Sequence, residues 1–202
     1  DTTSYVNLVD ITTKQIETVH IANRHMEDPN WHKDNCLLLN SYGRLEKIDL
    51  ETRELSMVPT GSLTALNNDH GLSPNQDQLV LSNFEKLGST MEELESSLYI
   101  VDVAGGEPQK VSTDKICFWH GWSPDGNTLA YTGYKKGNLD VYTIPVTGGK
   151  AKRLTKTEGL DDGPEYSPDG KYIYFNSYRS GHMQLWRMAP DGSKPEQLTF
   201  DK

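Results

Sequence analysis

The chain has 202 residues, of which 35% are hydrophobic, and its formal net charge is −9. It contains no run of about 18 apolar residues, which excludes a membrane-spanning helix. The acidic balance argues against nucleic acid as a partner, because phosphate binding needs a positive surface. It favours ligands that are basic, neutral or bridged by a metal ion.

The first segment, residues 1–20, holds two predicted strands at 5–10 and 15–20, joined by a short polar turn. These strands match the third and fourth strands of the longer units that follow. We therefore interpret the segment as the outer half of a four-stranded unit whose inner strands come from elsewhere.

Four longer units follow in chain order. Residues 21–60 form the first and residues 61–113 the second, which carries an insertion at 84–96. We interpret this insertion as a long surface loop with one turn of helix. Residues 114–157 and 158–202 form the last two units.

A short motif marks these units at intervals of about 40–50 residues, a period typical of solenoids and propellers. Its clearest copies are Trp122-Ser123-Pro124-Asp125-Gly126 and Tyr166-Ser167-Pro168-Asp169-Gly170, with weaker copies at 72–77 and 31–35. In each copy a turn precedes an apolar run, and Gly-Gly or Asp-Gly hairpin turns follow later in the unit. Four short strands per unit are typical of a propeller blade. The sequence predicts a single all-β domain over 1–202, a β-propeller with about four and a half blades of four antiparallel strands.

The repeat resembles that of TolB-type β-propellers, both in these motifs and in strand ends such as Arg153-Leu154-Thr155 and Gln197-Leu198-Thr199. The resemblance implies six blades, a binding scaffold and a periplasmic location, although a cytoplasmic location is equally compatible. Oligogalacturonate lyases, whose propellers bind a metal through histidines, look like more distant relatives.

Two histidines occupy equal positions in neighbouring units. His70 and His120 each stand four residues before a repeat proline, at the predicted start of the innermost strand, which faces the central channel. Four acidic residues fall in the same region of the units, namely Asp28, Asp69, Asp161 and Asp162. Imidazoles and carboxylates together can hold a divalent metal ion or orient a polar ligand. The alternative is that each histidine only satisfies backbone groups of its loop.

Two functions are compatible with this rim. The favoured one is a scaffold that recognises a protein, a peptide or another ligand across the channel mouth. The alternative is a metal-dependent lyase or hydrolase on uronate-type oligosaccharides, with the metal held by His70 and His120. In that reaction the metal would stabilise charge on a carboxylate while a base removes the adjacent proton. The sequence offers no convincing base, so no catalytic residue is assigned.

Closure of the ring is the last expectation. If one and a half blades are missing beyond Lys202, two apolar blade faces are left without a neighbour. We expect them to be covered by further sequence or by self-association of two chains, since a tighter ring would overpack the channel. Cys36 and Cys117 are interpreted as small buried residues, with a disulfide as the alternative.

Overall fold

The computed structural model of the protein describes residues 2–112 and 114–201, and this part of the chain contains strands and no helix. Accordingly, no helix that is long and apolar enough to cross a membrane is found there. The strands form one two-stranded sheet and four four-stranded sheets, all antiparallel. The prediction of an all-β propeller is thus confirmed.

Each sheet uses consecutive strands of the chain. The two-stranded sheet pairs β1 (Ser4–Val9) with β2 (Ile16–Ala22). The first blade holds β3 (Glu27–His32), β4 (Cys36–Ser41), β5 (Arg44–Asp49) and β6 (Leu55–Met57). The second holds β7 (Leu66–Leu72), β8 (Gln78–Lys86), β9 (Glu95–Asp102) and β10 (Gln109–Lys110).

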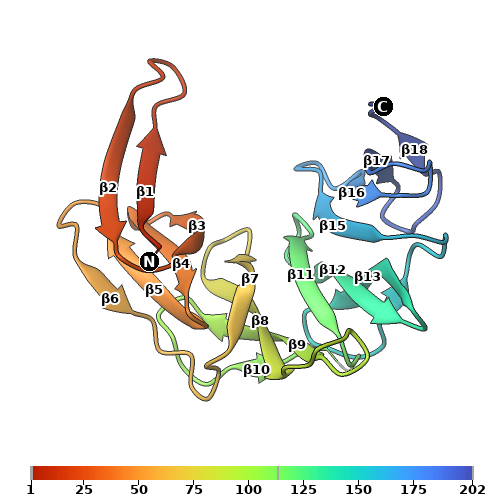
Figure 1. Ribbon diagram of the computed structural model, residues 1–202, viewed down its shortest axis with the longest axis horizontal. Helices are drawn as coiled ribbons and strands as arrows, with labels where there is room; N and C mark the ends of the chain where they lie inside the picture. Colours follow the sequence, from red (N-terminus) through yellow and green to blue (C-terminus); the bar gives the residue numbers. More distant parts are fainter. Residues whose placement is uncertain (1, 113, 202) are drawn as a thin grey trace.

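The last two blades follow the same order. The third holds β11 (Cys117–Trp122), β12 (Thr128–Lys135), β13 (Asn138–Pro145) and β14 (Lys152–Arg153). The fourth holds β15 (Asp161–Tyr166), β16 (Ile173–Ser177), β17 (Gln184–Met188) and β18 (Glu196–Gln197). The blades stand around an open arc, with the first strand of each on the inner side (Figure 1). Consecutive inner strands contact one another, from β3 to β7, β11 and β15.

The repeated turn has the same hydrogen bonds in three blades. The Ser123 hydroxyl donates to Asp125 at 2.5 Å and accepts from the Thr128 amide at 2.9 Å. Ser167 makes the equivalent bonds with Asp169 and Tyr172, and Ser73 with Asn75 and Gln78. The serine side chain thereby satisfies a backbone group at the start of the second strand, which explains why this motif precedes each apolar run.

The loop within the insertion at 84–96 is shorter than the sequence suggests. Strands β8 and β9 continue into both of its ends, with Phe84 opposite Ser96 and Lys86 opposite Glu95. The connecting turn also contacts the next blade, because the Lys115 ammonium donates to the Glu92 carbonyl at 2.7 Å. The loop is therefore tied to its neighbour and is not only a solvated excursion.

Apolar side chains are exposed at both ends of the arc. In the β1–β2 sheet Tyr5, Val9, Ile16 and Ile21 are all more than half exposed. In the last sheet Tyr178, Met183 and Leu185 are exposed as well. What covers these faces stays a prediction. Cys36 and Cys117 are both buried and form no disulfide, as expected for small apolar residues.

A glycine allows the inner strands of the second and third blades to approach. A Cβ atom added at Gly71 of β7 would lie 2.1 Å from the Trp119 ring of β11. Trp119 belongs to the largest core cluster, which packs Val80, Leu98 and Ile100 against Tyr131 and Tyr142 of the next blade. The contact at Gly71 therefore sets how closely two blades can pack.

We expect Gly71→Ala to destabilise the protein by about 1–3 kcal/mol, because the ring and both strands must shift to admit a methyl group. Urea unfolding of Gly71→Ala measures this cost. Repeating it in a Trp119→Leu background provides the control, since the smaller side chain leaves room for the methyl group. An equal cost in both backgrounds would contradict the steric explanation.

Candidate functional site

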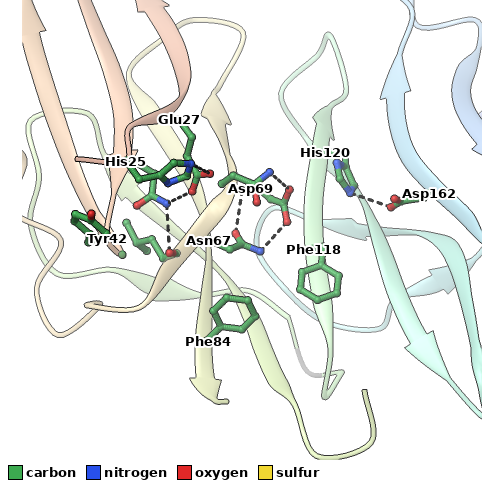
Figure 2. Close-up of a pocket in the computed structure, with 13 residues that line it drawn as sticks. His25, Glu27, Tyr42, Asn67, Asp69, Phe84, Phe118, His120 and Asp162 are labelled. Atoms are coloured by element: carbon green, nitrogen blue, oxygen red, sulfur yellow. Dashed lines mark hydrogen bonds and ion pairs between the residues drawn. The ribbon is translucent and has the colours of Figure 1, made fainter. Parts of the chain in front are cut away.

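The largest pocket opens at the inner strands and has a volume of about 480 Å³. Its walls come from all four blades and the segment before the first (Figure 2). Among the lining residues are His25, Glu27, Asn40, Asn67, Asp69, Phe84, Phe118, His120 and Asp162. Among the described residues no Lys or Arg lines it, so its ionisable side chains there are three carboxylates and two imidazoles.

A β-bulge interrupts the inner strand of every blade beside this pocket. The pairing register shifts between Glu27 and Asn30 in β3 and between Leu66 and His70 in β7. It shifts again next to Trp119 in β11 and after Asp162 in β15. A bulge bends the strand and turns a side chain away from regular alternation. Asp69, His120 and Asp162 all lie at these bulges, which accounts for their convergence on one pocket.

One wall of the pocket is held by Glu27 of the first blade. Its Oε1 accepts a hydrogen bond from the Asn40 amide at 2.8 Å, and its Oε2 lies 3.5 Å from Nε2 of His25. Figure 2 shows His25 and Glu27 grouped on the same side of the pocket. The carboxylate is thus fixed in place at the cavity wall by an amide and an imidazole.

Asp69 lies at the centre of the pocket, between the first and third blades (Figure 2). Its two oxygens accept hydrogen bonds from the Asn67 and Asn68 amides at 2.7 Å and 3.2 Å. Burial raises the pKa of Asp69 to about 6, and the neighbouring carboxylates of Asp162 and Asp28 act in the same direction, whereas His120 acts against them. This group is therefore poised to gain stabilisation from a positively charged ligand.

His120 and Asp162 form the opposite wall. Nε2 of His120 lies 3.3 Å from Oδ1 of Asp162, which also accepts from the Thr132 hydroxyl at 2.8 Å. This close contact with the imidazole is the main reason that the pKa of Asp162 is lowered to about 2. Asp162 is consequently ionised at any physiological pH.

Two phenylalanines cover the remaining side. Phe84 and Phe118 meet edge to face, with ring centroids 6.4 Å apart and an interplanar angle of 72°. Their rings give the pocket an apolar surface beside the carboxylates. Aromatic faces next to negative charge suit the ammonium or guanidinium group of a ligand.

The other predicted rim residues lie outside the pocket lining. The His70 ring is buried, with Nδ1 3.0 Å from the Asn68 carbonyl and 3.9 Å from Asp28. Burial lowers the pKa of His70 and raises that of Asp28. Asp161 is fully buried and accepts from Arg179 at 2.9 Å and from Thr157 at 3.1 Å. A shared ligand for His70 and His120 therefore stays a prediction.

A metal ion held by these two histidines stays a prediction. In the described residues no three His, Cys, Asp or Glu side chains are grouped in a way that could hold one. Nδ1 of His70 lies 3.0 Å from a backbone carbonyl, and of the two histidines only His120 lines the cavity.

Glu165 is a further acidic group near the site that the sequence did not single out. Burial raises its pKa to about 7, and the positive charge of His120 acts in the opposite direction. The register of β15 places it just after the bulge that follows Asp162.

Comparison with known proteins identifies the repeat. The family described as the TolB beta propeller domain matches residues 73–202. The chain belongs to the TolB β-propeller family. An uncharacterized protein of Agrobacterium fabrum is 39% identical over 165 residues, which are 81% of this chain and 54% of that protein. The chain thus spans about half the length of this curated relative.

Solved structures agree with the TolB propeller fold. A TolB-type structure from Agrobacterium tumefaciens is 39% identical, with a TM-score of 0.87 over 96% of this chain and 68% of that one. An oligogalacturonate lyase in complex with manganese superposes with a TM-score of 0.71 over 96% of this chain and 58% of that chain. At 16% identity the second similarity shows the shared fold alone.

We expect the two pocket aspartates to affect stability in opposite directions at pH 8. The folded-state pKa of Asp69 is raised, so its stabilising effect is present below about pH 4 and is lost as pH rises through about 6. Asp69→Asn should therefore raise the melting temperature at pH 8 and change it little at pH 4.

Asp162→Asn serves as the matched control from the same pocket. The folded-state pKa of Asp162 is lowered, so its stabilising effect is present above about pH 4 and is lost as pH falls toward about 2. This variant should melt at a lower temperature than the wild type at pH 8. Shifts of the same sign for both variants in calorimetry would show that the electrostatic assignment is wrong.

Proposed function

We propose that this TolB-like propeller is a binding scaffold whose channel mouth receives a positively charged group of a protein, a peptide or a small ligand. The observation that carries the proposal is a pocket lined by three carboxylates and two phenylalanines and, in the part of the chain that the structure describes, by no lysine or arginine. The net charge of −9 acts in the same direction, since it draws basic ligands toward the protein.

Two features of the pocket support recognition of a cation. Asp69 pays a desolvation cost in the free protein that a bound ammonium or guanidinium group would offset. Asp162 is held ionised by His120 and needs no ligand to become charged. A ligand with one cationic end and an apolar stem would contact both the carboxylates and the Phe84–Phe118 pair.

Fluorescence anisotropy with labelled tetralysine, tetraserine and tetraglutamate amides at pH 8 tests the proposal. We expect tetralysine to bind, and Asp69→Asn combined with Asp162→Asn to weaken it about tenfold or more, the loss typical of charge-assisted hydrogen bonds. Glu17→Gln combined with Glu51→Gln is the control, because it removes the same charge from exposed positions.

Equal weakening in the two double variants would show attraction to the overall charge and not binding in the pocket. Binding of tetraserine or tetraglutamate as strong as that of tetralysine would also contradict the proposal. The lyase or hydrolase alternative predicts a different result. It expects a stoichiometric divalent metal ion in the purified full-length protein that is lost in His70→Ala.

A further inference from the structure

A second pocket, of about 370 Å³, lies on the third blade and differs from the channel mouth in charge. We call it the basic pocket, and it is lined by Asp114, Lys135, Lys136, Tyr142, Lys150, Ala151 and Arg153. A smaller adjoining cavity of about 170 Å³ shares Asp114, Lys135 and Tyr142 with it. The two cavities are therefore neighbours, and both lie beside the β12–β13 hairpin.

The basic pocket gathers positive charge on an acidic protein. In the described residues the ion pairs of lysines involve Lys33, Lys110, Lys115 and Lys171. The three pocket lysines are not among them. Arg153 is paired with the fully buried Asp140, so its charge is largely compensated. Three uncompensated lysines facing one carboxylate leave the pocket with an excess of positive charge.

The hydroxyl of Tyr142 is an independent sign of a ligand. Only 6% of the surface of Tyr142 is exposed. Its hydroxyl has no hydrogen-bond partner in the described part of the chain. It lines both cavities. Burial raises the pKa of this phenol, so it stays protonated and able to donate. Buried polar groups without partners are uncommon in folded proteins, and each one calls for an explanation.

The ring of Tyr142 is held in place by its neighbours in the third blade. It stacks on Tyr131 with centroids 5.4 Å apart, and a Cβ atom at Gly133 would come within 2.9 Å of it. The Tyr131 hydroxyl donates to Asp114 at 2.6 Å, which holds that carboxylate at the same site. The hydroxyl of Tyr142 is thus a fixed donor beside exposed lysine side chains, an arrangement suited to an oxyanion.

We infer that the basic pocket binds a multiply charged oxyanion, the phosphate or carboxylate group of a small molecule, through Lys135, Lys136, Lys150 and the Tyr142 hydroxyl. This site is separate in residues and opposite in charge from the channel mouth. It does not depend on the function proposed there.

Isothermal titration with pyrophosphate at low ionic strength tests the inference, and citrate in a second titration separates phosphate from carboxylate chemistry. We expect Lys135→Gln combined with Lys136→Gln to weaken binding about tenfold or more. The matched control is Lys14→Gln combined with Lys47→Gln, which removes the same charge from exposed positions in the first two sheets. The control should leave the affinity within about twofold.

Tyr142→Phe separates binding from folding. Because its hydroxyl has no partner in the described residues, the variant should keep the wild-type melting temperature while losing about fivefold or more in affinity. The inference is wrong if neither probe binds at millimolar concentration, or if the two lysine double variants weaken binding equally. Unchanged affinity in Tyr142→Phe would show that the hydroxyl does not contact the bound anion.

Discussion

The close approach of the inner strands determines how the blades pack and whether they can share one pocket. Gly71 admits the Trp119 ring of the next blade, and Gly121 lies where a Cβ atom would come within 2.8 Å of the Pro164 carbonyl. These glycines stand in equal positions of β7 and β11, each after a histidine. Without them the blades would be pushed apart. The side chains of four blades could then not line a single pocket.

Charge is divided between two regions of the molecule. The channel mouth concentrates carboxylates, and desolvation and hydrogen bonding shift the pKa values of two of them in opposite directions. The basic pocket on the third blade gathers lysines around a buried tyrosine hydroxyl. The channel mouth lies where four blades meet, whereas the basic pocket lies within the third blade. A propeller can in this way present ligand sites of different charge on one scaffold.

Much of the fold could be predicted because the repeated serine turn has a local cause, a side chain that bonds the backbone of the following strand. The site could be predicted only in part. Regular alternation cannot indicate that Asp69 faces the pocket while the adjacent His70 is buried, since a bulge separates them from their regular register. Phe84 and Phe118 were missed because their role arises from a contact between two blades that no single repeat encodes.

A cation bound at the channel mouth would lie close to the imidazole of His120. This ring reports on binding directly, because it borders the pocket and contacts Asp162. The measurement is an NMR titration of the histidine ring signals with a lysine-containing peptide at pH 8. We expect the ring signals of His25 and His120 to shift together. The signal of His182, which lies outside the pocket lining, should stay unchanged. A shift of His182 with His25 and His120 unmoved would contradict it.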